Sequence, residues 1–102
     1  MARFDVHRYP GKTAPMVVDV QADLLSDLNT RVVVPLVPHA QAANEALPRL
    51  KPVLEIDGQA YILMTTDIAA LPERSLGQCV ANLEAHYRED IIGALDFLFQ
   101  GF

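Results

Sequence analysis

The stretch RVVVPLV, residues 31–37, is apolar on both faces of an extended chain and rich in β-branched residues. A strand of this composition is typically covered on both sides, so we predict that it forms the centre of a sheet. Pro35 has no N–H to donate to a neighbouring strand, and we therefore expect a bend, a bulge or an edge at that position.

Two stretches before this segment alternate between apolar and other side chains. In RFDVHRY (3–9), Phe4 and Val6 face one way, while Arg3, Asp5 and His7 face the other. MVVDVQ (16–21) repeats the pattern, with Met16, Val18 and Val20 on one side. A period of two residues is typical of a strand with one buried face, so we predict two such strands.

The segment after residue 37 contains a turn signal and a weaker helix signal. In PVLEIDGQAYILMTT (52–66), the pair Asp57-Gly58 separates two β-rich runs, which predicts a tight hairpin. Between the central strand and this hairpin, Pro38 and Pro48 limit any helix to a few turns at most.

The last quarter of the chain changes to a helical period. In LEAHYREDIIGALDFLF (83–99), apolar residues recur at helical spacing and form a stripe: Leu83, Tyr87, Ile91, Ala94, Leu95 and Leu98. The sequence therefore predicts a mainly β body followed by one amphipathic C-terminal α-helix. A length of 102 residues fits a single domain, residues 1–102.

Composition narrows the classes of partner and compartment. The net charge is -5, and the eight basic residues are scattered, which argues against binding nucleic acid directly. No apolar run approaches the roughly 20 residues of a membrane span, and the first residues lack the apolar core of a signal peptide. The only cysteine, Cys79, has no partner for an internal disulfide. We therefore expect a cytoplasmic protein that does not engage a membrane.

Candidate catalytic and metal-binding groups are few. The three histidines lie far apart without ligand spacing, so we expect no metal site from His7, His39 and His86. We expect Cys79 to be a small buried hydrophobe. In MTTD (64–67), hydroxyls beside a carboxylate after a strand are typical of turn and cap residues. No catalytic residue and no cofactor are predicted.

Two apolar segments remain open to two interpretations. In DLLSDL (23–28), adjacent leucines on an extended chain point to opposite faces, so Leu24 or Leu25 either packs in the core or faces outward. In QGF (100–102), Gly101 is a candidate helix C-cap, with Phe102 folding back onto the helix. The alternative is an exposed apolar end that serves as a contact surface for another protein.

Several stretches, taken together, resemble the CcdB toxins of toxin–antitoxin modules. These stretches are VDVQADLL (18–25), VVVPL (32–36), PVLEIDG (52–58), MTTDIAALP (64–72) and FQGF (99–102). They follow the family's order and nearly its spacing over the whole chain. The resemblance implies a small SH3-like β-barrel, as in the Kid and MazF toxins, with one C-terminal α-helix.

The resemblance also implies a function without catalysis. Proteins similar to CcdB form homodimers, bind the A subunit of DNA gyrase and trap its complex with cleaved DNA. A cognate antitoxin neutralises them. Carried over by position, the resemblance implies that the gyrase-binding residues are Leu24, Leu25, Asp96, Phe99, Gln100, Gly101 and Phe102.

The chain departs from the family at its C-terminal end. The family ends in Trp-Gly-Ile, whereas this chain has Gln100-Gly101-Phe102, and Asp96 stands where the family carries Asn. Losing an aromatic hot-spot residue typically costs on the order of 2–4 kcal/mol of binding free energy. An alternative is therefore an attenuated member that dimerises and binds antitoxin without poisoning gyrase.

Two further expectations concern the dimer and the barrel. The helical stripe offers more apolar surface than a barrel of this size needs, so we expect helices of two chains to pack together through Ile91, Leu95 and Leu98. A MazF-like endoribonuclease is a third function on the same barrel. It would need a basic, aromatic-lined groove with an acid–base pair, and the sequence has no such pattern.

Overall fold

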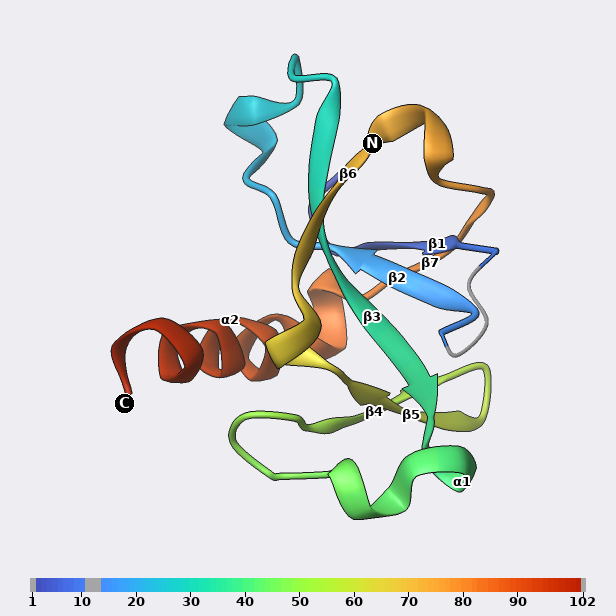
Figure 1. Cartoon of the computed structure of the whole chain (residues 1–102), viewed down its shortest axis with the longest axis vertical. Helices are drawn as coiled ribbons and strands as arrows, with labels where there is room; N and C mark the ends of the chain where they lie inside the picture. The colour runs from blue at the N-terminus through green and yellow to red at the C-terminus, as the bar shows by residue number, and fades with distance from the viewer. Residues whose placement is uncertain (1, 11–13, 102) are drawn as a thin grey trace.

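The structure is a computed structural model, and it describes residues 2–10 and 14–101. Its strands and α-helices are shown in Figure 1. The strands are β1 (Asp5–Arg8), β2 (Met16–Asp19), β3 (Thr30–Pro38), β4 (Val53–Ile56), β5 (Gln59–Leu63), β6 (Ala69–Pro72) and β7 (Cys79–Asn82). The helices are the single turn α1 (His39–Ala42) and the long C-terminal α2 (Glu84–Gln100).

The strands form one antiparallel sheet in the order β4-β5-β3-β2-β1-β7, and β6 also pairs with β3. This arrangement leaves β4 and β7 at the two ends of the sheet, and the result is a half-barrel (Figure 1). The predicted mainly β fold with one long C-terminal helix is confirmed. The central position predicted for residues 31–37 is also confirmed, because β3 pairs with β2, β5 and β6.

Pro35 lies where one side of β3 changes partner. Pairing with β6 extends to Val33, and pairing with β5 begins at Leu36. The Pro35 carbonyl accepts a hydrogen bond from the Met64 N–H at 2.9 Å. The nitrogen and carbonyl of one residue point to the same side of a strand, so the proline nitrogen points away from β2, toward the side where β6 gives way to β5. A central strand therefore holds a proline without losing a hydrogen bond to β2.

The predicted hairpin is confirmed between β4 and β5. Its two turn residues, Asp57 and Gly58, have φ angles of 52° and 79°. Positive φ at both positions matches the turn that suits the right-handed twist of paired strands. Ile56 pairs with Gln59 directly across this two-residue turn.

Helix α2 covers one face of the sheet with the predicted stripe. Leu83, Ile91 and Ala94 are buried and join the core residues of the strands, among them Phe4, Val6, Met16, Val18, Val34, Leu36, Leu54 and Leu63. The Glu55 N–H donates to the Tyr87 hydroxyl at 3.0 Å, which ties the helix to β4. The helix ends at Gly101, which has φ 79° and donates its N–H to the Phe97 carbonyl at 2.9 Å. Of the two interpretations left open for 100–102, the C-cap at Gly101 is thus confirmed, whereas Phe102 lies outside the described residues.

The prediction that β1 and β2 have only one buried face is wrong. His7, Val17 and Asp19 point away from the apolar core, yet their exposed fractions are 4%, 2% and 0%. The alternation correctly identified the strands, but it did not indicate solvent on the second face. Polar side chains can be buried there because they bond to one another and to the backbone.

Candidate functional site

The adjacent leucines lie on a single exposed turn, η1 (Asp23–Leu25), between β2 and β3. The exposed fractions of Leu24 and Leu25 are 93% and 47%. The turn is closed by backbone hydrogen bonds from Leu25 N–H to Ala22 O and from Ser26 N–H to Asp23 O. Both leucines therefore face outward, which favours the contact-surface interpretation over core packing.

Gln21 fixes this turn to the sheet. Its side-chain Nε2 donates to the Leu25 carbonyl at 2.9 Å, and its Oε1 accepts from the Val32 N–H at 3.0 Å. Gln21 is 6% exposed, and both bonds are partly shielded from water. One buried amide thus joins the turn that carries the leucines to the central strand.

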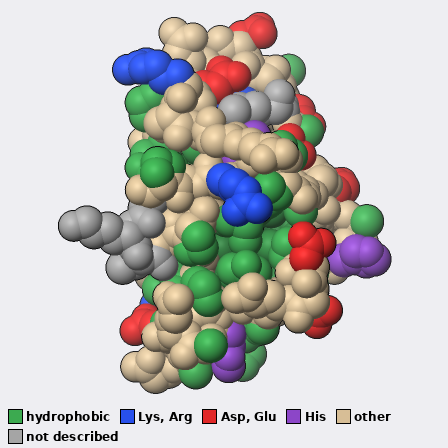
Figure 2. All heavy atoms as spheres, turned by 90° about the vertical axis from the view of Figure 1, so that its right-hand side faces the viewer, with side chains coloured by type: hydrophobic (Ala, Val, Ile, Leu, Met, Phe, Trp, Pro, Cys, Tyr) green, Lys and Arg blue, Asp and Glu red, His purple; other side chains and the backbone are tan. Residues whose placement is uncertain are grey.

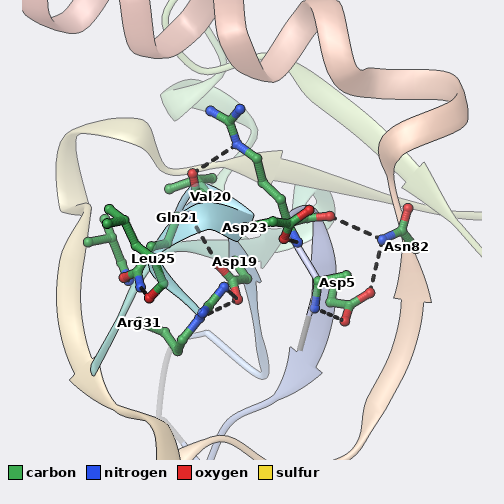
Figure 3. Close-up of polar contacts among 11 residues, drawn as sticks. Asp5, Asp19, Val20, Gln21, Asp23, Leu25, Arg31 and Asn82 are labelled. Carbon is green, nitrogen blue, oxygen red and sulfur yellow. Dashed lines mark hydrogen bonds and ion pairs between the residues drawn. The ribbon is translucent and has the colours of Figure 1, made fainter. Parts of the chain in front are cut away.

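The start of the chain holds the other side of the turn. Asp23 Oδ1 accepts a hydrogen bond from the Arg3 N–H at 2.7 Å, and Arg3 Nε donates to the Val20 carbonyl at 3.1 Å. Figure 3 shows these contacts gathered between β1, β2 and the turn. Hydrogen bonds therefore anchor the turn region on one side to the start of the chain and on the other to β3.

An ion pair beneath the turn completes this network. Asp19 and Arg31 have exposed fractions of 0% and 1%. Arg31 Nε donates to Asp19 Oδ2 at 2.7 Å, and Nη2 lies 2.7 Å from the same oxygen without hydrogen-bond geometry (Figure 3). The other carboxylate oxygen accepts the Gln21 N–H at 2.9 Å. Burial raises the pKa of the Asp19 carboxyl above its usual value, while the bonds from Gln21 and Arg31 oppose this shift.

The second candidate surface is the C-terminal end of α2. Phe99 is 70% exposed, and Asp96, Gln100 and Gly101 are also exposed. Phe97, two residues before Phe99, is half-buried and has the Arg49 guanidinium 4.3 Å from its ring centroid. Of the two phenylalanines in the last turns, Phe99 is thus the one that presents its ring to solvent.

Within one chain, the predicted gyrase-binding residues that the structure describes form two separate patches; Phe102 is outside the described residues. Figure 1 shows η1 and the end of α2 well apart, although on the same side of the molecule. We call them the leucine patch (Leu24 and Leu25) and the helix-end patch (Asp96 and 99–101). A single partner that touches both patches of one chain must therefore span the side of the molecule between them.

The three residues predicted at a dimer interface differ in burial. Ile91 has no exposed surface, because it packs in the core of its own chain. Leu95 and Leu98 keep part of their surface in solvent. In this conformation, direct contact with a second chain is thus open to Leu95 and Leu98, and Ile91 would act only by supporting the helix.

Apolar exposure is not confined to these two patches. Figure 2 shows hydrophobic side chains gathered on another face of the molecule, with charged side chains around them. The exposed large hydrophobic residues also include Leu28, Leu47 and Val53. Exposure alone therefore does not identify the interaction surface. The turn with Leu24 and Leu25 differs from the other exposed apolar residues in the network of hydrogen bonds described above, which holds it in place.

The structure corrects the expectation for Cys79 and brings together a cluster that sequence spacing did not reveal. Cys79 is exposed and not buried. A carboxylate oxygen of Asp5, a ring nitrogen of His7 and the Cys79 sulfur all lie within 4.8 Å of one another. Burial raises the pKa of Asp5, but hydrogen bonds from Asn82 and Ala2 outweigh it and leave that pKa below its usual value. Partial burial and the Asp5 carboxylate raise the pKa of the Cys79 thiol.

The fold and the two patches define a small half-barrel protein with one C-terminal helix and exposed apolar residues suited to contact with another protein. The family model described as CcdB protein matches residues 3–101, nearly the whole chain. The chain therefore belongs to the CcdB family of toxins from toxin–antitoxin systems. Among the described residues, no helix has both the length and the apolar character needed to cross a membrane.

Proposed function

We propose that this chain is the single-domain toxin of a type II toxin–antitoxin module. It binds the A subunit of DNA gyrase, traps the complex of gyrase with cleaved DNA, and is neutralised by a cognate antitoxin. Membership of the CcdB family supports the toxin class. The cytoplasm, where gyrase works on the chromosome, is the compartment in which this toxin acts.

The observation that carries the proposal is the display of Leu24 on a firmly held turn. Its side chain is 93% exposed, although burying a leucine typically gains about 1.5–3 kcal/mol. The turn beneath it is held by the buried Gln21 and by Asp23. A side chain held in water on such a support is pre-organised for a partner, because little conformational freedom is lost on binding.

The residue types of both patches favour binding over catalysis. Leucine, phenylalanine, glutamine and glycine have no side chain that exchanges protons near neutral pH. Asp96 is the one titratable residue among the seven proposed contact residues. Apolar and aromatic side chains of this kind are instead typical anchors of protein–protein interfaces. The toxin therefore needs neither a catalytic residue nor a cofactor.

A homodimer is part of the proposal. Leu95 and Leu98 lie on α2 and retain exposed surface, and Phe99 follows them directly. A two-fold contact along this helix places the helix ends of two chains near one axis, because the same surface is used twice. Sedimentation as a monomer at micromolar concentration would contradict this arrangement.

The helix-end patch sets the expected strength of gyrase binding. Gln100 stands where the family carries Trp, and a large aromatic side chain is the kind of anchor that such interfaces favour. The variant Gln100→Trp should therefore bind the gyrase A subunit about thirtyfold to a thousandfold more tightly than the natural chain, which corresponds to roughly 2–4 kcal/mol. The exposed Phe99 ring gives the natural chain part of the contact.

Growth after induced expression tests the proposal. Two bacterial hosts are compared, one with wild-type gyrase and one with a toxin-resistant gyrase A subunit. Arrest in the first host only supports gyrase poisoning. Arrest in both hosts contradicts gyrase as the target, with RNA cleavage tested next, and no arrest in either favours the attenuated alternative.

Matched variants separate the patches from general effects on folding. Leu24→Asp and Phe99→Asp should abolish arrest while the far-ultraviolet circular dichroism spectrum and the melting temperature stay near those of the natural chain. Val53→Asp is the control, because Val53 is also exposed, at 45%, but lies on β4 away from both patches. Equal loss of arrest in all three variants would contradict the proposed contact residues.

A further inference from the structure

The pairing of β1 with β7 places three metal-ligating side chains next to one another. Asp5 and His7 are two residues apart on β1, so they point to the same face of the sheet. His7 pairs with Cys79 on β7, and the register shifts between Val6 and His7. Such an irregularity re-aims side chains locally, and here the candidate ligand atoms of all three residues lie within 4.8 Å of one another.

His7 is held in a form that suits a metal ion. Its side chain is 4% exposed, and Nδ1 lies 3.1 Å from the Gly77 carbonyl oxygen. A carbonyl only accepts hydrogen bonds, so Nδ1 carries a proton, and in the neutral ring Nε2 then has the free lone pair. Among the described residues, this buried Nε2 has no hydrogen-bond partner. A histidine that donates one N–H to a carbonyl and offers its other nitrogen is the usual arrangement around a bound metal.

The surroundings of the other two side chains also fit a ligand role. Asp5 Oδ1 accepts a hydrogen bond from Asn82 Nδ2, and Oδ2 accepts one from the Ala2 N–H, each at 2.9 Å; Figure 3 shows these contacts. These bonds orient the carboxylate and leave lone pairs free. Cys79 is exposed, so an ion can reach the cluster from solvent.

We propose that Asp5, His7 and Cys79 bind one zinc ion, or a divalent ion of similar preference such as cobalt. A set of one oxygen, one nitrogen and one sulfur ligand suits these ions, whereas calcium and magnesium prefer oxygen ligands alone. Three protein ligands leave the fourth tetrahedral position to water. The ion joins β1 to β7, the strand that directly precedes α2.

The required movement is small. Zinc–ligand bonds of about 2.0–2.3 Å place the ligand atoms of a tetrahedron about 3.3–3.8 Å apart. The present separations, up to 4.8 Å, exceed this spacing by at most about 1.0–1.5 Å, so the ligand atoms move together by that amount when the ion binds. Gly77 keeps the His7 support in place, because a Cβ at this position would lie 2.8 Å from the Arg8 carbonyl oxygen.

The spacing of the histidines had predicted no metal site, and this cluster contains only one of them. Its members come from positions 5, 7 and 79, which no short ligand motif joins. The pairing register of β1 and β7, and not any pattern in the sequence, therefore reveals this cluster. Nothing in this proposal depends on gyrase binding, so either proposal can fail without the other.

The test is isothermal titration calorimetry. The whole chain is reduced, freed of metal with a chelator and titrated with zinc chloride alone. We expect one ion per chain. Cobalt chloride, added separately, should give the visible absorption of a tetrahedral site and a sulfur-to-metal charge-transfer band. Zinc should also raise the melting temperature, because it binds the folded chain.

Variants identify the ligands. Cys79→Ser replaces an exposed side chain, so it should fold normally, lose the charge-transfer band and bind zinc at least about tenfold more weakly. Asp5→Asn should also weaken binding, whereas the control His86→Gln, an exposed histidine on α2, should not. Absence of zinc binding by the natural chain, or equal binding by Cys79→Ser and the natural chain, would overturn the proposal.

Discussion

Replacing Asp19 by asparagine should strongly destabilise the protein, because it leaves a buried arginine without its counter-ion. Asparagine has nearly the same size, so the change removes the charge with little effect on packing. Arg31, 1% exposed, then remains in the interior, where its charge is no longer hydrated by water. The Gln21 N–H, which the carboxylate accepts at 2.9 Å, can still bond to the amide oxygen.

The expected size follows from the burial of the pair. Removing one partner of a buried ion pair typically costs about 3–5 kcal/mol of unfolding free energy. Domains of this size are typically stable by about 5–15 kcal/mol, so the change removes a large part of the total. Each kcal/mol lowers the melting temperature of a domain of this length by roughly 4–8 °C.

Urea unfolding followed by circular dichroism measures this difference. The control is Glu84→Ala, which breaks the pair with Arg88 on α2. That pair joins side chains that are 53% and 47% exposed, so the loss should stay below about 0.5 kcal/mol. A second variant, Asp19→Asn with Arg31→Met, removes both charges, keeps an oxygen for the Gln21 N–H and should recover much of the stability.

The reasoning would be refuted if Asp19→Asn lost less than about 1 kcal/mol of unfolding free energy, because a buried charge without a counter-ion destabilises a protein by more than that. It would also be refuted if the uncharged double variant were as unstable as the single one. In that case the shape of the two side chains, and not their charge, would explain their place in the structure.

Four further substitutions have expected outcomes that can be measured by urea unfolding. Gln21→Ala leaves the partly buried Val32 N–H without its partner and should cost about 1 kcal/mol or more, with faster amide hydrogen exchange at 23–25. Gly58→Ala, at φ 79°, should cost about 1–2 kcal/mol, whereas Gly93→Ala, inside α2 with open space around it, should stabilise by about 0.5–1 kcal/mol; equal effects would contradict the turn assignment. Ile91→Ala should cost about 2–5 kcal/mol, and a loss below about 1 kcal/mol would contradict its place in the core.

Several elements could be predicted because their signals lie in neighbouring residues. The pair Asp57-Gly58 specifies its turn through the φ angles that these residues tolerate, and the structure has that turn. The apolar stripe of α2 follows from the helical period, and its C-cap follows from Gly101. The two-residue period likewise located β1 and β2, and the β-branched apolar run located β3.

Other features depended on residues far apart in the chain. The sequence left open whether Leu24 packs in the core or faces solvent, because both interpretations fit the same residues. In the structure, hydrogen bonds from Gln21 and Arg3 hold its turn in the exposed position. Exposure of Cys79 and its approach to Asp5 follow from the register of β7 against β1.

The sequence by itself thus determined the type and order of the main elements and the family's motifs, since turn preferences and periodicity act over a few residues. Only the tertiary structure decided which polar side chains are buried and which apolar ones are displayed. Asp19 illustrates the reason. An aspartate is usually expected at the surface, but strand pairing brings Arg31 within 2.7 Å of it and allows both to be buried. Burial depends on what the fold places opposite a residue, and a single chain position does not contain that information.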